Sequence, residues 1–178
     1  MNYLEEVQKS MNYLSKNKKV IFIGQSVEFP GSSIYVSLKK VPMHKRLELP
    51  VFEETQMGLS LGLALNGFIP ISCFPRFDFL ILAMNQLVNH LDKIDYLTNN
   101  KFKSKIIVRT LIGSTKPLNA GPQHTQDHTI GIKKMLKFSK VINLKNKKNI
   151  FKTYKKIISS KSKEKIFVLI EDGNEYNK

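Results

Sequence analysis

Residues 49–67 read Leu-Pro-Val-Phe-Glu-Glu-Thr-Gln-Met-Gly-Leu-Ser-Leu-Gly-Leu-Ala-Leu-Asn-Gly, so that two carboxylates separate a proline from an apolar run rich in small residues. The run predicts a helix from about residue 54 to residue 65, ending at an Asn-Gly pair that commonly terminates helices. The acids Glu53 and Glu54 have two interpretations. They are ordinary first-turn residues, favoured by the helix macrodipole, or one of them is a carboxyl group held in an apolar wall for proton chemistry.

Helices and strands alternate on both sides of this stretch. Apolar spacing predicts helices over residues 3–16, 78–97 and 149–159. Short apolar runs bounded by turn residues predict strands over residues 19–24, 69–74, 105–112, 141–144 and 165–170. The alternation predicts an α/β fold of three layers, in which a mainly parallel sheet of about five or six strands has helices on both faces. The 178 residues suit one domain, over residues 1–178.

In such folds ligands bind beyond the carboxyl ends of the strands. Those ends lead here into the loop that starts at Gln25, the segment 74–79 and the loop 113–128. Phe77 and Phe79 stand where a planar ligand ring could stack, although core packing is the alternative interpretation.

Two histidines and an aspartate lie within residues 124–128, a composition that invites a metal interpretation. No third ligand of suitable type is evident nearby, so we expect no metal site. A histidine beside a ligand, titrating near neutral pH, is the better interpretation of His124 or His128.

The chain is strongly basic, with 29 Lys and Arg against 14 Asp and Glu and a formal net charge of +15. Such a charge suits nucleic acid or an anionic membrane. However, the excess is lysine spread along the chain, and no nucleic-acid-binding signature is visible. Only Arg46, Arg76 and Arg109 are arginines. We therefore expect a solvated lysine surface, no nucleic acid and no membrane; an acidic partner subunit remains a further possibility.

A single cysteine, Cys73, excludes an internal disulfide and fits a reducing compartment. The N-terminus lacks a secretory leader pattern, because it carries Glu5 and Glu6 and no apolar core region. No apolar run is long enough to span a membrane. We expect a soluble, cytoplasmic protein.

Taken in order, the segments resemble the pyrimidine-binding domain of transketolase-like, thiamine-diphosphate-dependent enzymes, and most closely the beta subunit of 2-oxo acid dehydrogenase first components. The likeness covers roughly residues 3–172. The motifs that carry it are Pro50 to Glu53, Gly67 to Pro70, the aromatics Phe77 and Phe79, the pair Gln86 and Asn89, the strand with Arg109, and Gly-Pro-Gln-His-Thr-Gln over residues 121–126.

The resemblance implies roles for individual residues. Glu53 corresponds to the family's catalytic glutamate, with Glu54 held in reserve. Phe79, with Phe77 beside it, corresponds to the aromatic that contacts the aminopyrimidine of thiamine diphosphate. His124 corresponds to the active-site histidine. A carboxyl group in an apolar wall would share a proton with the pyrimidine ring, while His124 would act at the substrate carbonyl.

The chain departs from the family in two ways. Thr55 stands where relatives often carry glycine, and the sequence stops where a beta subunit would continue into a further domain. It also lacks a Gly-rich phosphate loop. The resemblance therefore implies a partner, an alpha-like chain that holds the diphosphate and Mg²⁺, in a heterotetramer with active sites between subunits. Gly58 and Gly62, four residues apart on one helix face, suit close packing against a second copy or that partner.

The resemblance implies a two-chain enzyme that decarboxylates a 2-oxo acid or transfers a ketol or acyl unit from a ketose. The alternative is a non-catalytic interaction subunit of the same fold, which binds an acidic partner or nucleic acid through its basic surface.

Overall fold

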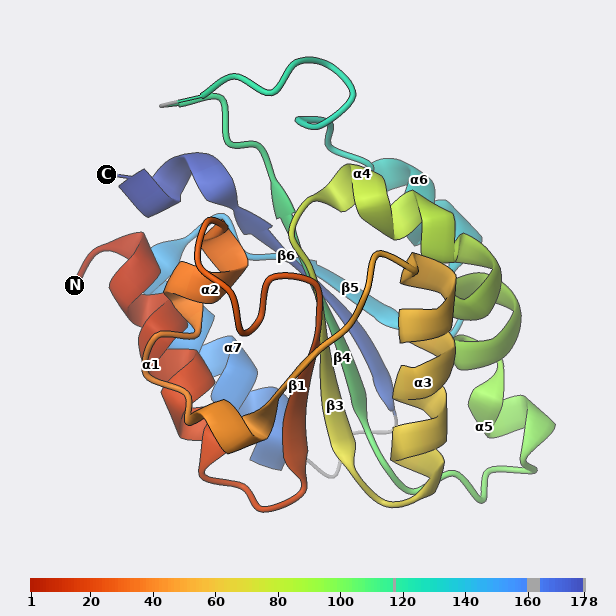
Figure 1. Ribbon diagram of the computed structural model, residues 1–178. Helices are drawn as coiled ribbons and strands as arrows, with labels where there is room; N and C mark the ends of the chain where they lie inside the picture. Colours follow the sequence, from red (N-terminus) through yellow and green to blue (C-terminus); the bar gives the residue numbers. More distant parts are fainter. Residues whose placement is uncertain (117, 160–163, 178) are drawn as a thin grey trace.

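The computed structural model describes residues 1–116, 118–159 and 164–177. These residues form a six-stranded sheet in the order β2-β1-β3-β4-β6-β5, and every paired strand is parallel to its neighbour (Figure 1). The strands are β1 (Val20–Gly24), β2 (Arg46–Glu48), β3 (Ile69–Phe74), β4 (Ile106–Ile112), β5 (Lys140–Asn143) and β6 (Ile166–Asp172). The predicted α/β class with a parallel sheet is confirmed.

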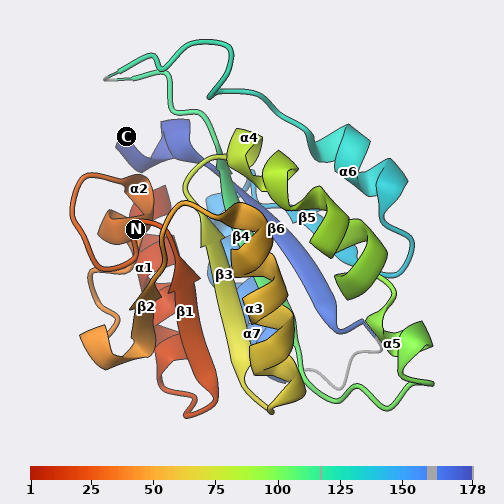
Figure 2. The same ribbon diagram turned by 45° about the vertical axis from the view of Figure 1, so that its right-hand side comes forward.

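Helices cover both faces of the sheet, as Figure 2 shows. Helices α1 (Tyr3–Ser15) and α7 (Lys147–Ser159) pack together on one face, with the short α2 (Ser33–Ser37) against α1. Helix α3 (Glu53–Leu65) and the segment after β3 cover the opposite face. Each face has its own apolar core, and the strands between them are apolar on both sides, as expected of a sandwiched parallel sheet.

The prediction of one helix over residues 78–97 is wrong. The segment is divided into α4 (Phe77–Leu80), the 3₁₀ turn η2 (Ile81–Ala83), the π-helix η3 (Gln86–Leu91) and α5 (Ile94–Leu97). The apolar residues still face the core, so their spacing resembles that of a regular helix. At the end of η3, the N–H of Asp92 bonds to the carbonyl of Leu87, five residues back. Apolar spacing does not distinguish such a bond from an α-helical one.

Several short elements have no clear sequence signal. They are β2, α2, the 3₁₀ turns η1 (Met43–Lys45) and η4 (Gly173–Asn177), and α6 (Thr129–Met135). Each has at most seven residues, too few for a periodic pattern. The elements α1, β1, α3, β3, β4, α7 and β6 lie within two residues of the predicted bounds. Within the described ranges, no helix has the length and apolar character that a membrane span requires.

Candidate functional site

The two acids at the start of α3 occupy different environments. Glu53, the first residue of the helix, is only 6% exposed, whereas Glu54 is exposed. The N-cap residue Phe52 makes no side-chain cap bond. The acidic side chains of the first turn complement the positive end of the helix dipole. The structure therefore distinguishes the two acids by their environment, which their adjacent positions in the sequence do not.

Glu53 lies beside the end of β1, where the chain stops adding strands on one side of the sheet and begins adding them on the other. Gln25, which directly follows β1, donates from Nε2 to Glu53 Oε1 at 3.1 Å. From β1 the chain continues to β2 at one edge of the sheet, while β3, on the other side of β1, leads to β4 in the opposite direction. The crevice beyond such a switch point is where open α/β sheets bind ligands.

The side chain of Glu54 is turned toward η3. Asn85 Nδ2 donates to Glu54 Oε1 at 2.9 Å, and Gln86 Nε2 lies 3.4 Å from the same oxygen. The pKa of Glu54 is lowered below its ordinary value, mainly by the hydrogen bond from Asn85 and next by the one from Gln86. Glu54 is thus a surface carboxylate held by two amides, and Gln86, one of the motif residues, contacts it directly.

The backbones of β1 and β3 approach closely beside α3. Gly24 has φ +142°, and a Cβ there would lie 2.2 Å from the carbonyl oxygen of Cys73, so this position requires glycine. Gln56, one helical turn after Glu53, donates from Nε2 to Ser72 Oγ and to Cys73 O, both at 3.0 Å. Among the described residues its Oε1 has no partner, which leaves a buried acceptor on the same helix face as Glu53.

The loop 113–128 is tied to the end of β3 by two charged side chains, although residue 117 lies outside the described part. Arg76 Nη1 donates to the carbonyl oxygens of Gly113 at 3.1 Å and of His124 at 2.8 Å. Asp78 Oδ1 accepts from Gln126 Nε2 at 2.8 Å. The loop therefore has a defined position over the carboxyl end of the sheet.

Two ring pairs connect the same segments. Phe79 and His124 meet edge to face with centroids 5.5 Å apart, and Phe77 meets His128 in the same way at 5.4 Å. Phe79 is partly exposed, whereas Phe77 is fully buried in the apolar core. His128 Nε2 also lies 3.2 Å from Asp78 Oδ1.

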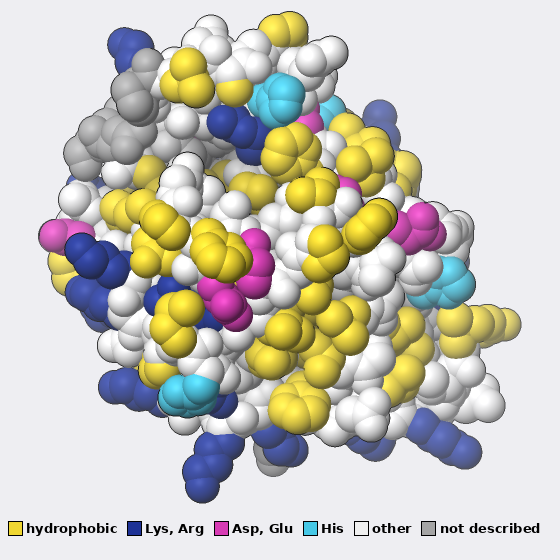
Figure 3. Space-filling model, viewed as in Figure 1, with side chains coloured by type: hydrophobic (Ala, Val, Ile, Leu, Met, Phe, Trp, Pro, Cys, Tyr) yellow, Lys and Arg dark blue, Asp and Glu magenta, His cyan; other side chains and the backbone are white. Residues whose placement is uncertain are grey.

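The sequence-predicted residues thus gather at one edge of the sheet. η2 and η3, which continue from α4, pack against α3, and the start of α3 lies beside α4 in Figures 1 and 2. In the space-filling view, histidine and hydrophobic side chains gather over this region (Figure 3). No cluster of three or more potential metal ligands occurs in the described ranges.

Sequence comparison relates the chain to known proteins. No protein-family model matches the chain. Over 116 residues it is 28% identical to "Pyruvate dehydrogenase E1 component subunit beta" of Chaetosphaeridium globosum, a match that covers 64% of this chain and 35% of the relative. Over 117 residues it is 25% identical to "2-oxoisovalerate dehydrogenase subunit beta" of Bacillus subtilis (strain 168), covering 64% and 36%. Over about two thirds of its length, the chain is similar to beta subunits of 2-oxo acid dehydrogenases.

The fold also matches a solved structure of a split gene transketolase in an inactive beta4 tetramer. The TM-score is 0.62 at 14% identity, over 97% of this chain and 51% of that chain. This likeness bears on the fold and confirms the transketolase-like architecture. The chain spans about a third of the length of the curated relatives it matches.

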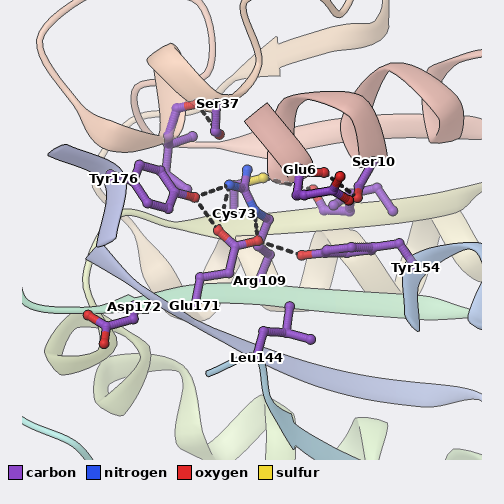
Figure 4. Close-up of polar contacts among 12 residues, drawn as sticks. Glu6, Ser10, Ser37, Cys73, Arg109, Leu144, Tyr154, Glu171, Asp172 and Tyr176 are labelled. Atoms are coloured by element: carbon purple, nitrogen blue, oxygen red, sulfur yellow. Dashed lines mark hydrogen bonds and ion pairs between the residues drawn. The ribbon is translucent and has the colours of Figure 1, made fainter. Parts of the chain in front are cut away.

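The motif arginine of β4 lies in the interior of the protein, beside Cys73 of β3. Arg109, wholly buried, donates from Nε to Glu171 Oε1 and from Nη2 to Glu171 Oε2, both at 2.7 Å (Figure 4). Tyr154 donates to Oε1 at 2.6 Å, and Tyr176 donates to Oε2. Burial, and then the charge of Glu171, raise the pKa of both tyrosines. The cluster joins β4, β6, α7 and η4, so its effect is structural.

The loop between β1 and β2, which lacks any periodic pattern, is fixed by two side chains of β2. The Glu48 carboxylate accepts the backbone N–H groups of residues 26–28 at 2.6–2.8 Å. Arg46 donates to the carbonyl oxygens of Val27, Leu38 and Val41. Sequence reasoning missed both residues, because only the fold shows that a three-residue edge strand lies beside the loop of Gln25.

Proposed function

We propose that this chain is the pyrimidine-binding subunit of a two-chain, thiamine-diphosphate-dependent enzyme, with residues 1–178 forming that single domain. The reaction class is cleavage or transfer of a carbon–carbon bond next to a ketone, on a 2-oxo acid or a ketose. The observation that carries the proposal is the buried carboxylate of Glu53 at the switch point of the sheet. The homology to beta subunits supports it.

In this proposal Glu53 holds and returns a proton at the aminopyrimidine. Its Oε1 is already oriented by Gln25, which limits the positions the carboxyl group can take. Burial keeps water from competing for the proton. Glu54 does not suit the role, because it is exposed and bound by Asn85 and Gln86.

Phe79 and His124 have the other two roles. The partly exposed ring of Phe79 offers a stacking surface for the aminopyrimidine, and the fully buried Phe77 supports it from within. His124 is fixed edge to face against Phe79, and Arg76 holds its carbonyl. Its Nδ1 is buried without a partner among the described residues, so its hydrogen-bonding capacity is unused, and in the proposal the ring acts at the substrate carbonyl.

The residues present fit the pyrimidine half of the cofactor. An aminopyrimidine offers a ring nitrogen for a carboxyl group, an amino group for a buried acceptor, and a flat face for an aromatic ring. Glu53, Gln56 Oε1 and Phe79 supply these three complements. When bound, thiamine diphosphate supplies the nucleophile and the electron sink of the reaction.

The proposal assigns the diphosphate and Mg²⁺ to an alpha-like partner chain, in a heterotetramer. Exposed apolar side chains lie just before α3 and in η2, and a second chain would cover them. They are Val51 (70% exposed), Phe52 (64%), Ile81 (46%) and Leu82 (63%). Gly58 and Gly62, on the same helix, leave room for a close backbone, since at Gly62 an added Cβ would meet no atom within 4 Å.

The test is binding linkage in the two-chain complex. The chain is mixed with the product of the neighbouring gene, and thermal unfolding is followed with thiamine diphosphate and Mg²⁺, with Mg²⁺ alone, and with pyrophosphate and Mg²⁺. The proposal expects a midpoint that rises with thiamine diphosphate concentration and exceeds both controls. A rise equal to that given by pyrophosphate would show that only the partner's phosphate site is involved, and would contradict a pyrimidine site on this chain.

A further inference from the structure

Lysines gather at the edge of the sheet opposite to the Glu53 crevice. All strands of a parallel sheet begin at one edge, so the residues that precede them are neighbours in space. A lysine directly precedes β1, β2, β4 and β6, and β5 begins with one; these are Lys19, Lys45, Lys105, Lys165 and Lys140. Figure 3 shows Lys and Arg side chains projecting along the lower side of the view, where β1 and β3 begin in Figure 1.

The part of this edge at β1, β3 and β4 carries positive charge without acidic residues. The loop before β1 reads Lys-Asn-Lys-Lys over residues 16–19, and the segment before β4 reads Lys-Phe-Lys-Ser-Lys over residues 101–105. Lys16, Lys18, Lys19, Lys101 and Lys103 are exposed. None of these five takes part in the ion pairs found between described residues. We call the loops 16–19 and 101–105, with residues 64–69 between them, the lysine edge.

The lysine edge contains a cavity of about 380 Å³ whose lining is both basic and apolar. Its lysines come from the two loops, and its apolar residues include Ala64, Leu65, Ile69, Phe102 and Ile158. Beside it, Leu65 is 58% exposed and Phe68 is 42% exposed. One of the lysines, Lys105, donates from Nζ to the carbonyl of Ile157 at 2.6 Å and so forms part of the wall.

We propose that the lysine edge is a docking surface for an acidic protein segment that also carries apolar side chains. Carboxylates on the segment would pair with the exposed lysines, and its apolar side chains would enter the cavity beside Leu65 and Phe68. Apolar contacts inside a charged rim are the usual composition of protein interfaces. The opposite edge, with Glu48, Glu53 and Glu54, carries acids, so an acidic partner would be steered to the lysine edge.

A protein segment suits this surface better than nucleic acid. Arginine is the residue most used to bind phosphates and bases, and all three arginines lie elsewhere. Arg46 and Arg109 are buried, and Arg76 binds the loop at the opposite edge. The cavity lining is mainly aliphatic, and Phe102, its aromatic ring among the described residues, is 3% exposed. Beside the cavity the lysine edge has one exposed ring, Phe68, whereas binding of single-stranded nucleic acid uses several aromatic rings on which successive bases stack.

The test measures binding of three probes to the full chain by fluorescence anisotropy. The first probe is a labelled peptide of Asp and Glu with leucine at every fourth position. The second replaces each leucine by serine, and the third is single-stranded poly-uridine RNA. We expect the leucine peptide to bind, the serine peptide to bind more weakly, and the affinity of both to decrease as salt is added.

Variants locate the binding. Lys101→Glu with Lys103→Glu should weaken binding of the leucine peptide about tenfold or more, because two attractions become two repulsions. The matched control is Lys147→Glu with Lys148→Glu, which makes the same charge change at exposed positions of α7 near the opposite edge. All four lysines are exposed, so the Lys101 and Lys103 double variant should unfold in urea like the wild type. The control changes the first two residues of α7, where the new carboxylates complement the helix dipole, so this variant should be at least as stable as the wild type.

Three results would overturn the proposal. They are absence of peptide binding, equal weakening by the two double variants, and tighter binding of the RNA than of the leucine peptide. Lys161 and Lys163 lie outside the described residues, and the proposal makes no use of them. The proposal does not depend on the thiamine-diphosphate assignment, since the two edges are at opposite ends of the strands.

Discussion

Replacing Glu53 by glutamine separates the proton chemistry of this chain from its folding. Glutamine has nearly the same shape and keeps an oxygen that can accept the bond from Gln25 Nε2. What disappears is the ability to hold and release a proton. General acid–base groups contribute a factor of about 10² to 10⁴ in rate, which corresponds to about 3–5 kcal/mol of barrier. We therefore expect kcat of the two-chain complex to decrease by about that factor.

The same substitution should affect stability little. The bond from Gln25 becomes a neutral one, a change of about 1 kcal/mol, and the loss of one negative charge at the start of α3 costs about 0.3–1 kcal/mol. Removing a buried charge offsets part of this cost. Urea unfolding of the isolated chain should therefore show a decrease of less than about 2 kcal/mol, set by these same terms.

The control is Glu54→Gln, which removes the neighbouring, exposed acid. This variant should keep near wild-type kcat, because Glu54 faces Asn85 and Gln86 rather than the crevice. Activity assays of the reconstituted complex are compared with urea unfolding of each chain alone. The reasoning is refuted if Glu53→Gln retains wild-type turnover, or if Glu54→Gln is the variant that loses it.

Two further predictions concern the framework. Burial raises the pKa of Asp92, but Lys93, the N–H groups of Lys137 and Phe138 and the hydroxyl of Ser139 outweigh it and lower the pKa from 3.8 to about 2. A shift of this size stabilises the fold by about 2 kcal/mol above pH 4. Asp92→Asn should lose that amount at pH 7, and urea unfolding should show the deficit shrinking as pH falls from about 4 toward 2; a pH-independent deficit would contradict it. Arg109→Met leaves the buried Glu171 without its counter-ion and should lower the free energy of unfolding by about 3–5 kcal/mol. Adding Glu171→Met should recover part of this loss. If the single variant were as stable as the wild type, the ion pair would not be needed for stability.

The sequence by itself determined the class of fold, because long elements carry their own signals. Apolar runs define the buried strands β1, β3, β4 and β6, and their alternation with helices requires parallel pairing. The same local information failed over residues 78–97, where the apolar residues face the core although the backbone changes between α, 3₁₀ and π turns. Side-chain spacing records which face is buried, and it does not record which carbonyl each N–H reaches.

For the candidate site, the sequence supplied the residues and the tertiary structure decided their surroundings. The resemblance favours Glu53 over Glu54, but their different surroundings come from packing of Gln25 against one and of Asn85 and Gln86 against the other. These partners lie 28 to 32 residues away along the chain. Burial and hydrogen bonding at a parallel-sheet edge depend on strand order, which brings distant segments together, and no local pattern encodes that order.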